Sequence, residues 1–349
     1  MCRIGLNFSV EQAVNARLLY PLTFKPVLRD YVWGGRRLET LYGRTLPPEG
    51  PVAESWEISG HANGPSVVES GFWQGHTLPQ VLAELGADLV GNRAAWALRR
   101  GRFPLLVKIL DAAQHLSVQV HPPDDYALLH ENGELGKTEM WYVLHAQPGA
   151  EIVLGTQPGT TPKMLRQAIA HNTLESYLRR LPVRVGDAIF IPAGTLHALL
   201  AGLLVIEVEQ NSDTTYRVYD WGRLGADGQP RPLHVEKSLA VINFHDAPPD
   251  VCRPMPAAAA PGITRHELCR CQYFVVEKVQ LGPGALFQGH TNGQTLEMWG
   301  TLEGQAELSW EGGTELDLPT IRFCLIPASL GSFSLHSEHS TTLLRVYLP

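Results

Sequence analysis

A short segment at residues 117–121, SVQVH, carries polar side chains at every second position. Successive side chains of a β-strand point to opposite faces, so Ser117, Gln119 and His121 would share one face and the two valines the other. Such a polar face usually meets solvent, but it can also line a pocket. Because an amide oxygen and an imidazole can both bind a metal ion, a pocket with a metal is the functional alternative.

Two later residues could complete a metal site. Glu139 follows Lys137 by two positions on a predicted strand, so the two side chains share a face. His197 ends the pattern G-x5-P-x4-H, which starts at Gly186 and predicts a tight turn followed by a strand. Any one of the 14 histidines taken alone is more often a surface residue or a hydrogen-bonded core residue. Two imidazoles, a carboxylate and an amide oxygen together suit Zn²⁺, although iron or manganese would accept similar ligands. The predicted metal ligands are Gln119, His121, Glu139 and His197.

Charged residues with catalytic potential lie on two apolar strands. Glu207 and Glu209 project to one side of LLVIEVEQ, where carboxylates would be costly to bury without partners. Arg217 and Arg223 follow shortly and could supply the compensating charge. The alternative is a solvated edge strand with a surface ion pair. Lys108, in LLVKIL, is a further candidate, although a lysine at a strand end can simply extend its ammonium group into solvent.

The bulk composition restricts the class of protein. The 349 residues, 44 % of them apolar, are enough for two or three domains with well-filled cores. A net charge of −7 argues against nucleic acid as the main partner. We expect no membrane span, no secretory signal and a cytoplasmic location, because long apolar runs are missing. The five cysteines lack C-x-x-C spacing, which argues against a cysteine zinc site.

The predicted elements are mostly short strands separated by glycine and proline turns, which indicates a β-sandwich or barrel. Leucines at three-to-four spacing predict a helix within residues 76–91. A helical insert is expected at about 161–180, with Thr161 and Asn172 opening its two helices. The proline- and alanine-rich segment 246–262 is the expected linker.

One sequence pattern occurs twice. The tripeptide EMW begins at Glu139 and again at Glu297, and each copy continues to an Ile-Pro-Ala turn and a final apolar strand. The repetition predicts a duplicated barrel. Aligning the two turns places Ser332 opposite His197, so only the first copy could build the metal site.

These motifs resemble those of the type I phosphomannose isomerases, a family of the cupin superfamily. Residues 119–122 match Q-x-H-P, residues 137–140 match K-x-E-M, and residues 192–197 match P-x-G-x-x-H. The resemblance covers residues 21–240 well, including WGGRRL, ESWEIS and EVEQNSDTTYRVYDWGR, and the last hundred residues loosely. It implies a mainly β fold of two cupin-type jelly-roll barrels with a small helical insert.

The expected domain organisation follows from the linker, the repeat and the resemblance. It consists of an N-terminal extension at 1–20, a catalytic metal-binding cupin domain at 21–245, the linker at 246–262, and a second, degenerate cupin domain at 263–349 that lacks the metal histidine.

The resemblance also implies a reaction, the interconversion of mannose 6-phosphate and fructose 6-phosphate through a cis-enediol. The expected partner is a small-molecule phosphosugar, and the expected cofactor is one zinc ion per chain. Proton transfer between C1 and C2 needs a base and an electrophile, and a metal can polarise the sugar oxygens. The family's active-site glutamate lies ten residues before an arginine, which favours Glu207 over Glu209. The expected catalytic residues are Glu207, Arg217 and Lys137, and the expected substrate-binding residues are Ser117, Lys108 and Arg223.

Two other functions are compatible with the same motifs. An Fe(II) cupin oxygenase would use two histidines and one carboxylate, but Gln119 as a fourth ligand leaves fewer open positions. A non-catalytic phosphosugar-binding cupin would need no acid or base. The intact ligand set, with Glu207 and Arg217 beside it, argues against this alternative, although fold alone does not imply activity.

Overall fold

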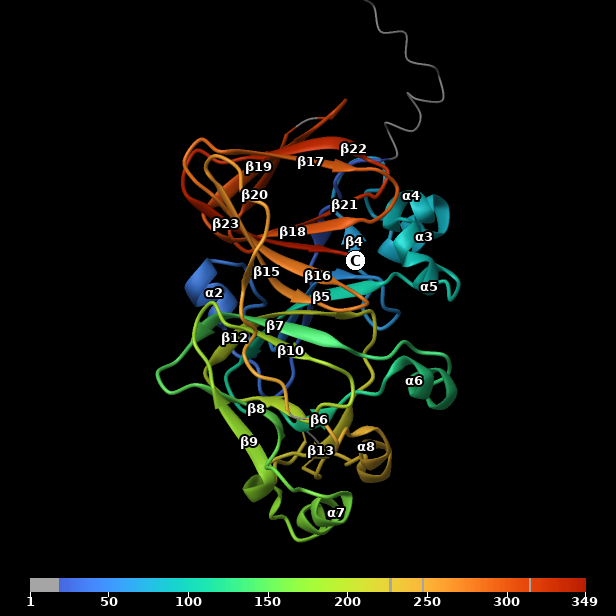
Figure 1. Ribbon diagram of the computed structural model, residues 1–349, viewed down its shortest axis with the longest axis vertical. Coiled ribbons are helices and arrows are strands. Elements are labelled where there is room, and N and C mark those ends of the chain that lie inside the picture. Colours follow the sequence, from blue (N-terminus) through green and yellow to red (C-terminus); the bar gives the residue numbers. More distant parts are fainter. Residues whose placement is uncertain (1–18, 226–227, 247, 314) are drawn as a thin grey trace, which may run out of the picture. The chain divides into compact units, whose positions relative to one another are not determined.

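The computed structural model describes residues 19–225, 228–246, 248–313 and 315–349 (Figure 1). The described chain is mainly β, as the sequence predicts, and it divides into two compact units. The central unit consists of residues 26–65 and 104–254, and the terminal unit consists of residues 66–103 and 255–349 together with the described residues up to Lys25. Residues 66–103 therefore group with the C-terminal part of the chain, whereas the sequence assigns them to the first domain. The predicted domain boundaries stay a proposal, and the extension at 1–20 lies almost wholly outside the described residues.

The central unit is built from two antiparallel sheets. The larger has the strand order β10-β7-β12-β5-β3-β2, and the smaller has the order β13-β6-β11-β8-β9. Leu110, Val143 and Val205 from the larger sheet and Ile152 and Leu199 from the smaller share one buried core, so the sheets pack face to face. The strands are β2 (Val27–Arg29), β3 (Glu54–Ser59), β5 (Leu105–Ala112), β6 (Val118–Val120), β7 (Glu139–Ala146), β8 (Glu151–Thr156), β9 (Leu178–Pro182), β10 (Ala188–Ile191), β11 (His197–Leu199), β12 (Leu203–Gln210) and β13 (Tyr216–Tyr219).

Two helices cover the outer face of the smaller sheet. Val118 and Val120 of β6 pack in one buried cluster with Leu165 of α7 (Pro162–Ala170), and Leu239 of α8 (Val235–Val241) joins it. Because the valines face these helices, Gln119 between them faces the other way, toward the inside of the barrel. The polar side of SVQVH is therefore the inner side. The remaining helices of this unit are α2 (Arg37–Tyr42) and α6 (Asp124–His130).

Two helix predictions need correction. The segment 76–91 forms two helices, α3 (Leu78–Leu85) and α4 (Ala87–Val90), rather than one, because Gly86 between them adopts φ +50°. In the insert, Thr161 caps α7 by accepting a hydrogen bond from the Met164 backbone, as predicted. Asn172, however, opens no second α-helix. Only the short 3₁₀ turn η2 (Leu174–Tyr177) follows before strand β9 begins.

The terminal unit repeats the strand order of the central one, read in the opposite direction for the larger sheet, except that its smaller sheet has no counterpart of β13 among the described strands. Its larger sheet has the order β14-β15-β16-β23-β18-β21, and its smaller sheet has the order β17-β22-β19-β20. Strand β22 pairs with β17 so that Ser332 lies opposite His290, just as His197 of β11 lies opposite Gln119 of β6. The strands are β14 (Met255–Pro256), β15 (Ile263–Arg270), β16 (Val275–Leu281), β17 (Leu286–Thr291), β18 (Glu297–Glu303), β19 (Gln305–Trp310), β20 (Leu316–Pro319), β21 (Phe323–Ile326), β22 (Gly331–His336) and β23 (Thr341–Tyr347).

The repeated strand order supports the duplication predicted from the two EMW motifs. The terminal unit also contains a two-stranded sheet and a short helical segment. Their elements are β1 (Phe24–Lys25), β4 (Val67–Val68), α3, α4, η1 (Asn92–Ala94) and α5 (Ala95–Leu98).

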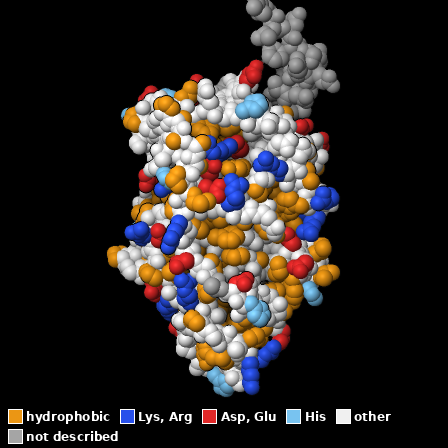
Figure 2. All heavy atoms as spheres, viewed as in Figure 1, with side chains coloured by type: hydrophobic (Ala, Val, Ile, Leu, Met, Phe, Trp, Pro, Cys, Tyr) orange, Lys and Arg blue, Asp and Glu red, His pale blue; other side chains and the backbone are white. Residues whose placement is uncertain are grey.

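In the part of the chain that the structure describes, no helix is long and apolar enough to cross a bilayer. Figure 2 shows acidic and basic side chains mixed over the visible face rather than gathered by sign.

Candidate metal and substrate site

Three buried side chains of the central unit converge on one point inside the barrel. His121 follows β6, Glu139 begins β7 and His197 begins β11, and one ligand atom from each lies within 4.8 Å of the others. The Nε2 atoms of His121 and His197 lie 3.4 and 3.2 Å from the two carboxylate oxygens of Glu139. All three side chains are at most 1 % exposed. Imidazole nitrogens and a carboxylate in this arrangement are a metal-ligand set.

Backbone carbonyl groups fix which ring nitrogen each histidine presents. The Nδ1 atom of His121 lies 2.8 Å from the Thr214 carbonyl oxygen, and that of His197 lies 2.9 Å from the Thr195 carbonyl oxygen. A carbonyl only accepts, so each Nδ1 carries the proton and each Nε2 offers its lone pair to the centre. This is the tautomer that a metal-binding histidine needs.

Gln119 is positioned to supply a fourth ligand. It pairs with His197 across β6 and β11, and its Nε2 atom lies 3.3 Å from the Nε2 atom of His197. Binding of an ion requires the amide to turn by half a rotation, so that its oxygen rather than its nitrogen faces the centre. The four predicted ligands are therefore brought together.

The local electrostatics favour the unprotonated forms of the ligands. Burial lowers the pKa of His121 to about 4, and the neighbouring ammonium group of Lys137 adds to this effect. Burial alone would raise the pKa of Glu139, but the positive charge of Lys137 outweighs it and holds that pKa well below its usual range. Both groups are thus free of competing protons near neutral pH.

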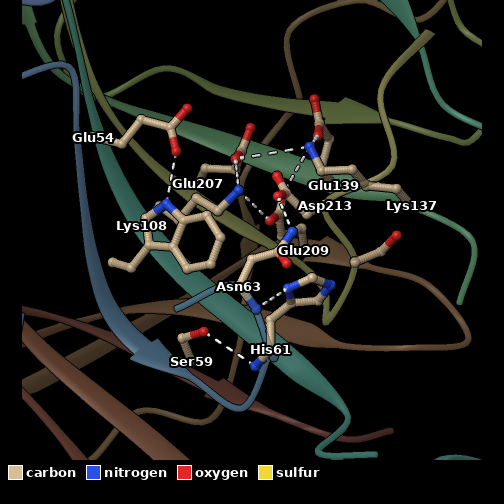
Figure 3. Close-up of polar contacts among 12 residues, drawn as sticks. Glu54, Ser59, His61, Asn63, Lys108, Lys137, Glu139, Glu207, Glu209 and Asp213 are labelled. Carbon is tan, nitrogen blue, oxygen red and sulfur yellow. Dashed lines mark hydrogen bonds and ion pairs between the residues drawn. The ribbon is translucent and has the colours of Figure 1, made fainter. Parts of the chain in front are cut away.

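A buried cluster of lysines and glutamates adjoins the ligands (Figure 3). Glu209 bridges two ammonium groups, with its oxygens 2.8 Å from Lys108 Nζ and 2.6 Å from Lys137 Nζ. Lys137 Nζ also lies 2.5 Å from Glu139, while Glu207 lies 3.7 and 3.8 Å from the two ammonium groups. Burial disfavours the charged form of Lys137, but these carboxylates outweigh it and raise its pKa well above the usual value.

The strand register explains why these side chains meet. Lys108 of β5, Glu207 of β12 and Trp141 of β7 lie in one cross-strand row, and Glu209 pairs with Glu139 in the next. Directly paired residues of antiparallel strands project to the same face. The indole Nε1 of Trp141 donates a 2.8 Å hydrogen bond to Glu207, which orients that carboxylate.

The charge balance of this cluster points to a divalent cation. Glu54, Glu139, Glu207 and Glu209 face only two ammonium groups, so two negative charges remain when all four carboxylates are ionised. Burial raises the pKa of Glu209 and of Glu54, and the negative charge of Glu207 adds to the effect in both. A bound divalent ion would bring the cluster to neutrality, so the residues fit a metal ion.

A cavity of about 310 Å³ opens beside the metal ligands. Most of the predicted site residues line it, namely Lys108, Ser117, Gln119, Lys137, Glu207 and Arg217. Arg223 does not line it, because its guanidinium is engaged by Asp220 and the His115 carbonyl group. The predicted substrate contact of Arg223 remains a prediction without support from this placement.

Sequence reasoning missed several residues of the cavity. The remaining lining residues are Tyr31, Trp33, Glu54, Leu110, Leu116, Asp213, Thr215 and Arg231. Glu54 begins ESWEIS, but its parity puts it on the same strand face as the apolar residues Trp56 and Ile58 of β3, so alternation alone does not mark it as a cavity residue. Asp213 and Arg231 lie outside regular strands, where no periodicity marks them.

A double-layered β-barrel with an inward-facing His/Glu/His/Gln set and a polar cavity beside it defines a metal-dependent enzyme of the cupin type. Comparison with known proteins identifies the family of this enzyme. Residues 22–138 match the family model of the type I phosphomannose isomerase catalytic domain.

Similar proteins extend this match over more than nine-tenths of the chain. A mannose-6-phosphate isomerase from Bacillus subtilis is 47 % identical over 228 residues, which is 65 % of this chain and 70 % of the relative. A probable mannose-6-phosphate isomerase from the same organism is 37 % identical over 91 % of this chain and 96 % of its own length. The crystal structure of a Bacillus subtilis mannose 6-phosphate isomerase superposes with a TM-score of 0.82 at 33 % identity, covering 94 % of this chain and 99 % of that one.

The chain belongs to the type I phosphomannose isomerase family. It is therefore an aldose–ketose isomerase, and neither the cupin oxygenase nor the non-catalytic binding module is supported.

Proposed function

We propose that this enzyme interconverts mannose 6-phosphate and fructose 6-phosphate and that Gln119, His121, Glu139 and His197 hold one zinc ion for the reaction. The observation that carries the proposal is the buried ligand set beside a polar cavity, in a chain that aligns with mannose-6-phosphate isomerases over nine-tenths of its length. Two imidazoles, a carboxylate and an amide oxygen suit Zn²⁺. When bound, the ion would act as a Lewis acid toward the sugar oxygens.

Glu207 is the proposed acid/base for proton transfer between C1 and C2. It lines the cavity, it is 3 % exposed, and Trp141 fixes one of its oxygens. The second oxygen lies between the ammonium groups of Lys108 and Lys137, at 3.7 and 3.8 Å. A carboxylate held in this way can take a proton from one carbon and return it to the other, since its position does not change between the two steps.

Lys137 is the proposed partner of Glu207. It reaches both the metal-ligand Glu139 and the proposed base, and it lines the same cavity. A buried ammonium group at this position can stabilise the oxyanion of the cis-enediolate as charge develops. Arg217, the other predicted helper, makes no ion pair with Glu207 or any other described carboxylate, so its predicted role in proton transfer has weaker support.

The first experiment is an isomerase assay on the purified protein before and after chelation. We expect fructose 6-phosphate to form from mannose 6-phosphate, activity to vanish with the chelator, and zinc to restore it better than manganese or iron. His197→Phe is the matched variant: it should fold but bind zinc far more weakly, because a ring of similar size replaces the imidazole and offers no ligand atom. Absence of turnover by fully metallated, folded protein would contradict the proposed substrate, and better restoration by another metal would contradict zinc. The cytoplasmic location remains a prediction.

A further inference from the structure

A row of four directly paired residues crosses the larger sheet of the central unit, and a tryptophan stands at each of its ends. Trp56 of β3 pairs with Lys108 of β5, Lys108 pairs with Glu207 of β12, and Glu207 pairs with Trp141 of β7. Paired residues project to the same face of the sheet. Trp141 donates a hydrogen bond to Glu207, so Trp56 is the corresponding aromatic neighbour of Lys108.

The ammonium group of Lys108 lies over the indole ring of Trp56. The Lys108 Nζ atom is 4.6 Å from the centroid of the ring. At this distance the electron-rich face of an indole attracts a cation, and the attraction is strongest where water is excluded. The Trp56 residue is 0 % exposed and the Lys108 residue is 3 % exposed. The contact is therefore a buried cation–π interaction.

An indole face holds an ammonium group differently from a carboxylate. The Nζ atom of Lys108 lies 2.8 Å from Glu209 but 3.7 Å from Glu207, which is longer than a hydrogen bond. An ammonium group has three N–H donors, and a ring face attracts its charge without offering a lone pair. Trp56 thus fixes Lys108 without adding negative charge to the cluster. Donors of Lys108 remain for oxygen atoms of a ligand in the cavity, which Lys108 lines.

The indole of Trp56 is itself confined. Its Nε1 atom donates a 2.6 Å hydrogen bond to Glu54, and the guanidinium carbon of Arg29 lies 4.8 Å from the ring centroid. The backbone at Gly64 comes so close that a Cβ atom there would lie 2.9 Å from the ring. The indole therefore has little room to move, whereas the four-carbon stem of a lysine is flexible. The rigid partner determines where the flexible one lies.

We propose that Trp56 is a positioning residue of the active site, whose indole face holds the ammonium group of Lys108 at the substrate cavity beside Glu207. Figure 3 shows Lys108 between Glu54 and Glu207, the two carboxylates nearest to it in the view. Without the indole, Glu209 would be the main anchor of the ammonium group, and Lys108 could turn away from the cavity. The proposal rests on the proposed function for the substrate of the kinetic assay, but the placement of Lys108 does not.

The placement is tested by NMR of the metal-loaded full chain with labelled lysine. The chain has only six lysines, and Lys108→Met identifies the signals of Lys108. Because protons above an aromatic ring resonate upfield, the ε-methylene protons of Lys108 should be shifted upfield from those of the other lysines. Trp56→Leu should abolish this shift, and Trp56→Phe should keep part of it. Unshifted ε-methylene signals in the wild-type protein would overturn the proposal.

The kinetic consequence is tested by a double-mutant cycle. Loss of a buried cation–π contact in Trp56→Leu should lower kcat/KM for mannose 6-phosphate by about 10- to 30-fold. The same substitution made together with Lys108→Met should lower kcat/KM by less than about 3-fold relative to Lys108→Met alone, because the group that Trp56 positions is already missing. Trp56→Phe should give a value between those of Trp56→Leu and the wild type. Trp73→Leu, which removes a buried tryptophan of the terminal unit, is the control and should change neither kcat/KM nor the Lys108 signals.

The outcomes separate positioning from a structural role and from the reaction itself. An equal loss of kcat/KM with and without Lys108 would show that Trp56 only supports the fold, and this result would overturn the proposal. A wild-type protein that does not convert mannose 6-phosphate would contradict the proposed function, while the upfield shift would still support the placement of Lys108. If Trp56→Leu fails to fold, Trp56→Phe replaces it in the cycle, and full additivity with Lys108→Met would again overturn the proposal.

Discussion

Acidification of the metal-free protein tests the environment of His121 directly. An imidazole in an unfolded chain has a pKa of about 6.5. In the folded protein, burial together with the ammonium group of Lys137 lowers the pKa of His121 to about 4. At about pH 5.5 an ordinary imidazole would be about 90 % protonated, whereas one with a pKa of about 4 would be only about 3 % protonated. The two cases are therefore easily distinguished.

The same shift links protonation to stability. Since the folded-state pKa of His121 lies below the unfolded one, the unfolded chain binds more protons between about pH 6.5 and about pH 4. The free energy of unfolding consequently falls as the pH falls through this range. A shift of about 2.5 pKa units corresponds to a loss of about 3 kcal/mol in the free energy of unfolding, and this loss is complete only below about pH 4.

The assay is heteronuclear NMR of histidine-labelled protein stripped of metal, followed from neutral pH downward, with His121→Gln identifying the resonance. We expect the His121 ring to stay neutral until well below about pH 5.5. Lys137→Met should raise the pKa of His121 without restoring the ordinary value, because burial is the larger cause. Arg166→Met, at an exposed pair, is the control. A ring that titrates like an ordinary histidine would refute the reasoning, because it would mean that the ring is hydrated.

Three further predictions concern the carboxylate, its indole partner and the terminal unit. Glu207→Gln should lower kcat by about 10²- to 10⁴-fold with little change in KM, and steady-state rates near wild type would exclude Glu207 as the base. Trp141→Phe removes the donor to Glu207 and should lower kcat by about 10-fold while the zinc content by mass spectrometry stays unchanged; loss of zinc would instead indicate a structural role. Arg345→Met leaves the buried carboxylate of Glu297 without its guanidinium partner and should reduce the stability of the terminal unit by about 3–5 kcal/mol in denaturant titrations; a change like that of an exposed substitution, within about 0.5 kcal/mol, would contradict this.

The convergence of the predicted metal ligands could be anticipated because local spacing determines which side chains share a face. The alternation in SVQVH and the interval between Lys137 and Glu139 survive folding unchanged. Which face becomes the inner one depends on α7 and α8 packing against Val118 and Val120, and that packing is a tertiary effect. The resemblance to a known family supplied this information before the structure did.

Part of the cavity lining was not predictable from periodicity. Arg223 is nearer in sequence to Glu207 than Arg231 is. Asp220 and a backbone carbonyl group nevertheless hold Arg223 away from the cavity. Arg231 reaches the cavity from a segment without regular structure. The break at Gly86 was missed for a similar reason, since leucine spacing continues through a residue whose backbone cannot continue the helix.

In the terminal unit, which holds the second copy of the repeat, an arginine lies where the central unit has the proposed base. Arg345 there occupies the position that Glu207 has in the central unit, as the pairing of each with a tryptophan of EMW shows. It contacts both Glu297 and Glu277, so the carboxylate that survives from the ligand set is neutralised by a guanidinium instead of a metal. A catalytic interior must keep charges exposed to its substrate, which opposes tight packing. The interior of the terminal unit has no such requirement, so we expect a substitution there to change the stability of the protein rather than its chemistry, and the two halves of the gene to tolerate different substitutions.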